Sequence, residues 1–233
     1  MIKKEFLEQL KLRGVNCSES QYDELVNYMD AVLLTNEQFN LTAITNKEEF
    51  LEKMIFDSAL ASIGNDFNNK KVIDVGTGAG FPGMVLYILN PSMSLTFLDS
   101  TQKKINFILS YGEKNNYKYK GVSLRAEDHA RLHREEYDYA TARAVAPLNI
   151  LLELIIPMLK VGGTFIALKG PGYEDEIKSC EKAFKKLNCH IQKVYEDILP
   201  NCNDKRSIIY IIKDKQTIKK YPREYNEIKR LPL

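Results

Sequence analysis

The sequence lacks the marks of an exported or membrane-spanning protein. It begins Met1-Ile2-Lys3-Lys4-Glu5-Phe6, and no uninterrupted apolar run reaches the roughly 18 residues that a transmembrane helix needs. Its four cysteines are far apart and form no CxxC pair: Cys17, Cys180, Cys189 and Cys202. This spacing suggests neither a disulfide framework nor a structural zinc site. We therefore expect a cytoplasmic protein with reduced thiols, no signal peptide and no membrane span.

A strong excess of charge is also missing. The chain has 233 residues, a formal net charge of +2 and a pI near 8.2, which neither requires nor excludes a nucleic-acid partner. Basic residues gather near the end, where residues 213–230 hold seven Lys or Arg against three acids. Such a run is either a solvated surface or a contact with an anionic partner. The composition, 44% hydrophobic and 27% charged, fits one globular domain with a modest extension.

Residues 1–70 are predicted to form a helical extension. No proline occurs before Pro82, and Ser18 with Gln21 has the spacing of a capping box. Apolar residues then recur at helical spacing up to Leu34, and a second apolar stripe follows Asn46. The sequence therefore begins with helices rather than strands.

From Lys71 short apolar runs alternate with helix-length segments, which is typical of an α/β protein with a parallel sheet. The expected helices include residues 148–159 and 174–187. The expected strands are residues 72–75, 94–98, 122–124, 137–141 and 164–168, followed by a closing antiparallel hairpin of 191–198 and 207–212. We place the main domain at residues 71–213 and a basic tail at 214–233.

A glycine-rich loop follows the first expected strand. The segment Val72-Ile73-Asp74-Val75-Gly76-Thr77-Gly78-Ala79-Gly80-Phe81-Pro82-Gly83 ends a buried strand and opens a helix. Glycine adopts positive φ and has no Cβ, so a ligand can approach the backbone closely. Gly78, Gly80 and Gly83 also fit the GxGxxG spacing of dinucleotide sites, which is weak on its own. The loop predicts a nucleotide-containing cofactor, but the glycines alone do not determine which cofactor it is.

Two acids stand at the carboxyl ends of successive strands. Asp74 precedes Gly76 by two residues, as in methyltransferases of this architecture, where the carboxylate lies near the methionine end of the cofactor. Asp99 ends the next strand, where it can accept hydrogen bonds from ribose hydroxyls. Alternatively, the two acids only cap a turn and a helix.

Arg143 ends the fourth expected strand at the same edge of the sheet. An arginine there is costly to bury without a partner, so we expect it to meet a carboxylate, either the cofactor's own or that of Asp74, or else an RNA phosphate. A surface arginine is the alternative.

Several short motifs in order resemble the ribosomal RNA small-subunit methyltransferase G family, also called glucose-inhibited division protein B. The resemblance covers nearly the whole chain and is carried by residues 39–44, 56–58, 74–83, 98–100, 143–146, 167–170, 221–223 and 231–233. It implies a seven-stranded, Rossmann-like class I methyltransferase sheet preceded by helices. It also implies that S-adenosylmethionine methylates guanine N7 in 16S ribosomal RNA of the small subunit.

The resemblance also implies site residues. The positions that match the family's cofactor contacts are Gly76, Phe81, Ala126, Glu127 and Arg143, to which the general fold adds Asp74, Gly78 and Asp99. For the RNA substrate we propose Lys169 and Arg223. Contact with the cofactor, or a surface lysine that caps a carbonyl, are the alternatives for Lys169. Met54 departs from the pattern, since many relatives have histidine there.

The expected chemistry needs no catalytic side chain. Methyl transfer is an in-line displacement that depends on alignment and on exclusion of water, and guanine N7 carries no proton to remove. Methylation of pyrimidine C5 generally uses a nucleophilic cysteine in a Pro-Cys dipeptide, which the sequence lacks. Methylation of exocyclic amines usually shows an Asn/Asp-Pro-Pro-aromatic loop, which is also missing. His129 and His133 have no third ligand nearby in sequence, so we predict no metal.

Two other functions stay open at this stage. A nicotinamide-dependent oxidoreductase is favoured only by the GxGxxG spacing, and a noncatalytic RNA-binding protein would keep the fold without the activity. Tyr111, Tyr117 and Tyr119 lie among lysines, a pattern of nucleic-acid surfaces but also of exposed helix ends. We expect a monomer that acts on 16S ribosomal RNA or the small subunit.

Overall fold

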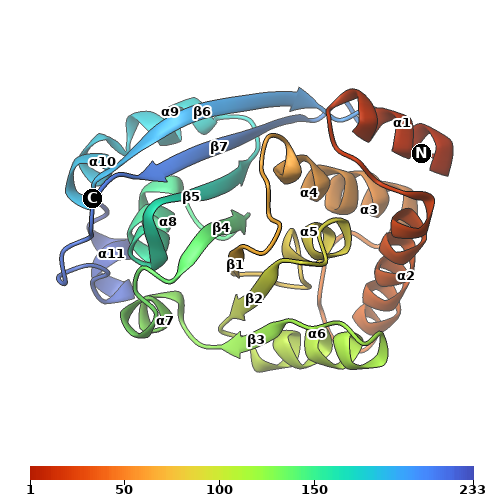
Figure 1. Cartoon of the computed structure of the whole chain (residues 1–233), viewed down its shortest axis with the longest axis horizontal. Helices are drawn as coiled ribbons and strands as arrows, with labels where there is room; N and C mark the ends of the chain where they lie inside the picture. Colours follow the sequence, from red (N-terminus) through yellow and green to blue (C-terminus); the bar gives the residue numbers. More distant parts are fainter.

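The computed structural model describes all residues, 1–233, and contains one seven-stranded sheet in the order β3-β2-β1-β4-β5-β7-β6 (Figure 1). All neighbouring pairs from β3 to β5 are parallel, whereas β7 runs antiparallel to both β5 and β6. The strands are β1 Lys71–Val75, β2 Ser94–Asp99, β3 Lys120–Ser123, β4 Tyr137–Arg143, β5 Leu159–Lys169, β6 Cys189–Ile198 and β7 Lys205–Lys213. The expected α/β class and closing hairpin are confirmed.

The strand order reverses at β1, which pairs with β2 on one side and β4 on the other. Helices after β1 and β4 leave the sheet in opposite directions at such a point, which opens a crevice at the carboxyl ends of the strands. Asp74, Asp99 and Arg143 all belong to strands that end at this edge. The topology therefore places the predicted site residues in one region.

Every strand differs from its predicted range by one to five residues, and in two strands the cause is an incomplete apolar signal. The edge strand β3 begins at Lys120, before Val122, and none of its residues is fully buried. In β5, residues 160–162 are exposed, so the strand begins five residues before the buried run that predicted it. Lys120 of β3 pairs with Thr96, and Leu159 of β5 pairs with Tyr137. Backbone pairing therefore extends both strands beyond the apolar runs that predicted them.

The chain starts with helices, as predicted. They are α1 Lys3–Leu12, α2 Glu19–Asn36, α3 Lys47–Phe50, the π-helical turn η1 Leu51–Phe56, α4 Asp57–Ala59 and the 3-10 turn η2 Leu60–Ser62. Ser18 and Gln21 form the expected capping box, and the Asn46 side chain accepts the Glu49 N–H at 3.0 Å. Both caps satisfy backbone donors at helix starts, which explains where α2 and α3 begin.

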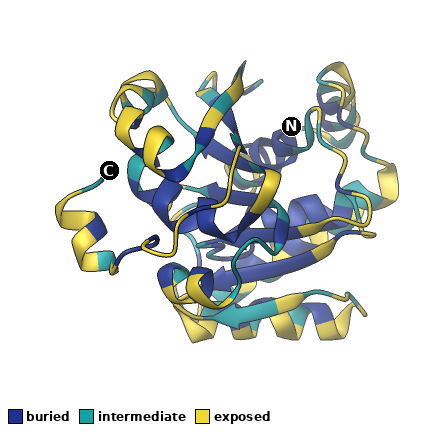
Figure 2. Ribbon diagram, turned by 60° about the vertical axis from the view of Figure 1, so that its left-hand side comes forward, coloured by how far each residue is buried: buried dark blue, intermediate teal, exposed yellow.

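Helices cover both faces of the sheet. The remaining ones are α5 Gly83–Leu89, α6 Gln102–Lys114, α7 Ala126–Leu132, α8 Leu148–Ile155, the 3-10 turn η3 Ile156–Met158, α9 Tyr173–Lys178, α10 Glu181–Leu187 and α11 Tyr225–Arg230. The first hydrophobic cluster joins the N-terminal helices to the sheet, for example Phe6 and Leu25 with Phe97. The second joins α8, α10 and the C-terminal residues Tyr221 and Ile228. Figure 2 shows buried strands between helices whose outer faces are exposed.

One predicted helix is divided in two, and another ends earlier than expected. The helix expected over 174–187 is divided at Ser179 and Cys180, whose side chains both donate to the carbonyl of Glu176 and so compete with the helical ladder. The helix expected over 148–159 gives way to η3, where Pro157 has no N–H to continue the helix. None of the helices combines the length and the apolar character that crossing a bilayer requires.

Candidate functional site

Asp74 organises the glycine loop from below. Its carboxylate accepts hydrogen bonds from the Thr77 hydroxyl at 2.5 Å, the Gly83 N–H at 2.9 Å and the Thr141 hydroxyl at 3.1 Å. The side chain has no exposed surface, and this burial raises its pKa to about 6. Asp74 thus ties the end of β1 to the start of α5 and to β4, and a ligand does not reach its carboxylate in this conformation.

The loop above Asp74 requires glycine. Gly76 has φ +68°, and a Cβ added there would lie 2.5 Å from Cγ2 of Val145, closer than real Cβ atoms come to other groups. Gly78 has φ +59°, and its N–H donates to Oδ2 of Asp99 at 3.0 Å. The other oxygen of Asp99 accepts the Thr101 N–H at 2.8 Å. Both acids therefore cap backbone donors, as the alternative interpretation supposed.

A cavity of about 300 Å³ opens beside this loop. Fifteen residues line it, among them Gly76, Asp99, Ala126, Glu127, Val145 and Tyr225. Glu127 is 6% exposed, and the Arg125 guanidinium both contacts it at 3.2 Å and stacks 4.3 Å from the centre of the Tyr225 ring. Apolar walls with two convergent carboxylates suit a nucleoside, whose hydroxyls and amine are donors.

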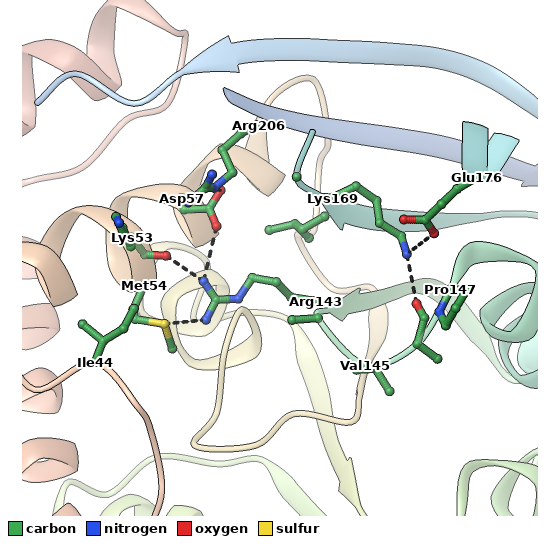
Figure 3. Close-up of a pocket in the computed structure, with 14 residues that line it drawn as sticks. Ile44, Lys53, Met54, Asp57, Arg143, Val145, Pro147, Lys169, Glu176 and Arg206 are labelled. Atoms are coloured by element: carbon green, nitrogen blue, oxygen red, sulfur yellow. Dashed lines mark hydrogen bonds and ion pairs between the residues drawn. The ribbon is translucent and has the colours of Figure 1, made fainter. Parts of the chain in front are cut away.

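Arg143 is held in place by the N-terminal helices (Figure 3). Its guanidinium donates to the Lys53 carbonyl at 2.9 Å, lies 3.3 Å from Oδ2 of Asp57 and 2.9 Å from the Met54 sulfur. Arg206 lies on the other side of Asp57, at 3.5 Å. The expectation that Arg143 meets a carboxylate is confirmed, but the carboxylate is that of Asp57 and not that of Asp74.

A second cavity, of about 570 Å³, lies next to Arg143. It shares Ala144 and Val145 with the first cavity, so the two meet at the end of β4. Lys169 lies at its wall, where its ammonium donates to Glu176 at 2.7 Å and to the Ala146 carbonyl at 3.0 Å (Figure 3). The predicted alternative for Lys169, a carbonyl cap, is thus observed.

A family model described as rRNA small subunit methyltransferase G matches residues 21–209. The chain belongs to this family. A protein from Halalkalibacterium halodurans named ribosomal RNA small subunit methyltransferase G is 40% identical over 235 residues, 98% of each chain. One from Clostridium botulinum with the same name is 39% identical over 224 residues, 94% of each chain.

Solved structures agree on the fold. A structure described as a SAM-dependent methyltransferase from Streptococcus mutans matches with a TM-score of 0.52 and 16% identity, covering 63% of this chain and 45% of that one. Pyrococcus horikoshii TYW2 in complex with MeSAdo matches with a TM-score of 0.55 and 8% identity, covering 68% and 62%. The sheet is thus the class I methyltransferase sheet that the resemblance implied.

The structure gathers most of the positions that were predicted to bind the cofactor, whether from the family or from the general fold. Gly76, Asp99, Ala126 and Glu127 line the first cavity, and Gly78 is bonded to Asp99 beside it. Phe81 is different, because it is 3% exposed and packs against Tyr28 and Phe50 with ring centres 5.6 and 5.5 Å away. Phe81 therefore lies beneath the loop, 5.7 Å from the Arg143 guanidinium.

Arg223, predicted to contact RNA, lines neither cavity. Its guanidinium forms two hydrogen bonds with the fully buried carboxylate of Glu153, at 2.8 and 2.6 Å. It also donates to the Leu231 carbonyl at 3.1 Å and contacts Glu227 at 3.3 Å. These partners use the donors that a phosphate would need, and Arg223 instead attaches the C-terminal segment to α8.

Many residues of the two cavities were not predicted as site residues from the sequence. Four of them are Asp57, Glu176, Arg206 and Tyr225. Asp57 lies inside the family marker 56–58, which was the one available signal for it. The other three stand in segments without a motif, and only the packing of α9, β7 and α11 against the sheet edge brings them there.

The two histidines near β4 are engaged with each other and with neighbouring side chains. The rings of His129 and His133 stack with centres 4.3 Å apart. His129 is hydrogen-bonded to the Tyr137 hydroxyl and His133 to Glu136, at 2.9 and 2.8 Å. No group of three or more His, Cys, Asp or Glu side chains is arranged to hold a metal ion.

Proposed function

We propose that this protein transfers a methyl group from S-adenosylmethionine to N7 of a guanine in 16S ribosomal RNA of the small subunit. The observation that carries the proposal is the pair of cavities that meet at Ala144 and Val145, one suited to a nucleoside cofactor and one lined by four cationic and two acidic side chains. In-line transfer needs a donor and an acceptor on opposite sides of one junction. Family membership supports the same reaction.

The first cavity fits the cofactor. Asp99 would accept hydrogen bonds from the ribose hydroxyls, while Ala126 and Glu127 would contact the adenine. Gly76 lets the ligand approach the backbone, which a Cβ at that position would prevent. When bound, S-adenosylmethionine supplies a methyl group on a positively charged sulfur.

Asp74 and Phe81 would act as positioning residues rather than as direct contacts. Asp74 holds both ends of the glycine loop, and Phe81 packs beneath it. Arg143 is aligned by Asp57, so its charge is fixed at the junction instead of moving in solvent. Residues that hold ligand-contacting groups in place determine how well a ligand is oriented.

The second cavity would receive the guanine. Ile44, Met54 and Val145 would provide apolar contact. Lys53 and Arg206 are ion-paired with Asp204, but the lining holds four cations against two acids, and this excess of positive charge would favour the flanking phosphates. Guanine N7 has a free lone pair and no proton, so the chain needs no general base. Its task is to align N7 with the methyl group and to exclude water.

Calorimetric titration with S-adenosylmethionine, and separately with NADH, tests the cofactor. We expect saturable binding of S-adenosylmethionine alone, lost in Gly76→Ala because the new Cβ presses on Val145 inside the cavity. The control is Gly14→Ala, which also places a side chain at positive φ but in open space remote from the site. Binding of NADH alone would indicate the oxidoreductase, and binding of neither would favour a noncatalytic RNA-binding protein.

A further inference from the structure

A groove separate from both cavities lies between α2 and α6, which approach each other in Figure 1. It encloses about 540 Å³. Its apolar part consists of five residues, Ala31, Leu34, Phe39, Phe107 and Tyr111. Leu34 is 65% exposed and the three rings are half-buried, so aromatic faces are available to a ligand.

The polar lining of this groove is cationic or neutral. Lys103 and Lys114 line it, and neither forms an ion pair with any acid of the chain. Asn106, Ser110 and Asn115 add neutral donors and acceptors, and no Asp or Glu lines the groove. An unpaired lysine beside an aromatic ring attracts a ligand that is flat at one end and anionic at the other.

Two chain segments connect the groove with the proposed site, although no residue lines both. On α6, Lys104 lines the cofactor cavity and Phe107 lines the groove one helical turn later, a rise of about 5 Å. After α2, Phe39 lines the groove and Ile44 lines the second cavity. A strand whose target base occupies the second cavity can therefore reach the groove with a nearby nucleotide.

We propose that this groove binds an unpaired nucleotide of the RNA substrate, next to the methylated guanine in the folded RNA. The base would stack on Phe107 and Tyr111, and the phosphates would contact Lys103 and Lys114. This proposal rests on the proposed function, because it takes RNA as the substrate. An apolar protein segment would leave both lysines without a partner, so the charge favours RNA.

Steady-state methylation of small subunits that lack the modification tests the groove. For Lys103→Glu/Lys114→Glu we expect KM for the RNA substrate to rise at least about tenfold with little change in S-adenosylmethionine binding. The logarithmic salt dependence of RNA affinity should also fall by about 1.4, from two lost phosphate contacts on a single strand. The control is Lys182→Glu/Lys186→Glu on α10, an equal charge change at exposed lysines, which should leave KM unchanged.

A stacking variant separates base contact from general charge. Phe107→Leu keeps an apolar side chain but removes the ring, and we expect about a tenfold loss of RNA affinity. Photocrosslinking of a 4-thiouridine-labelled RNA to Phe107 or Tyr111 in the wild type would support the same contact. Unchanged KM and salt dependence in the lysine variant, with an active wild type, would overturn the groove alone.

Two further outcomes have different meanings. If the wild type binds S-adenosylmethionine but methylates no RNA, the proposed function fails and the groove fails with it. If Phe107→Leu weakens binding to assembled subunits but not to protein-free 16S RNA, and the lysine variant has no effect, the groove holds a protein segment and the proposal is wrong.

Discussion

Asp74 shows how one buried residue can serve a site that it does not touch. Its carboxylate satisfies two hydroxyls and the N–H of Gly83, all within the protein. Burial in low dielectric penalises the ionised form, which is why the pKa rises to about 6 despite three hydrogen bonds. In the folded protein, the carboxyl group at the base of the glycine loop therefore titrates near pH 6.

The raised pKa of Asp74 predicts a specific pH dependence of stability. Since the folded state binds the proton more tightly than the unfolded chain, the contribution of Asp74 favours folding at low pH and is lost as pH rises from about 4 to about 6. On going from pH 7 to pH 4, the free energy of unfolding of the wild type should rise by up to about 3 kcal/mol relative to that of Asp74→Asn. Urea unfolding of both proteins across this range measures the difference, and a constant difference would contradict the assignment.

At the scale of elements, the C-terminal segment is attached to α8 by a buried ion pair. Glu153 on α8 is fully buried and accepts both the side chain and the backbone N–H of Arg223. The segment then brings α11 to the cofactor cavity, where Tyr225 forms part of the wall. The basic run near the end of the chain thus includes one arginine whose role is internal.

Removing one partner of this pair should destabilise the protein strongly. We expect Arg223→Met to lower the free energy of unfolding by about 3–5 kcal/mol, because it leaves Glu153 buried without a counter-charge. Glu153→Leu/Arg223→Met should recover most of that loss. Lys178→Met, which breaks an exposed pair with Asp175, should have almost no effect. Denaturant titration of the four proteins checks this, and equal losses in the single and double variants would contradict it.

At the scale of the whole molecule, the N-terminal helices are part of the main core. Phe6 and Leu10 of α1 belong to the same hydrophobic cluster as Val72 and Phe97 of the sheet. The helices also supply Lys53, Met54 and Asp57 to the second cavity. The domain boundaries predicted at residues 70 and 213 are compositional, and the packing across both is continuous.

This shared core predicts a single unfolding transition. Leu10→Ala in α1 and Leu187→Ala in α10 remove fully buried side chains from different clusters, and each should lower stability by about 2–5 kcal/mol. Both should shift one common transition in calorimetry, with equal calorimetric and van't Hoff enthalpies. A separate early transition in Leu10→Ala alone would show that residues 1–70 unfold independently.

The sequence alone predicted the sheet, its closing hairpin and the glycine loop. Each of these depends on local properties: buried strands are continuously apolar, and tight loops need glycine, so a short window is enough to identify them. The edge strand β3 and the interrupted helix at Ser179 were less accurate, because exposure and side-chain competition weaken the local signal.

Partners of charged residues were decided only by tertiary structure. The sequence predicted a counter-charge for Arg143 but did not identify Asp57 as that partner. It predicted an RNA contact for Arg223, whereas in the folded chain Arg223 forms a buried ion pair with Glu153. Ion pairs between distant segments follow from how elements pack and not from spacing along the chain. Residues at the carboxyl ends of the strands can therefore be named from sequence. The contacts that hold them in place are visible only in the folded chain.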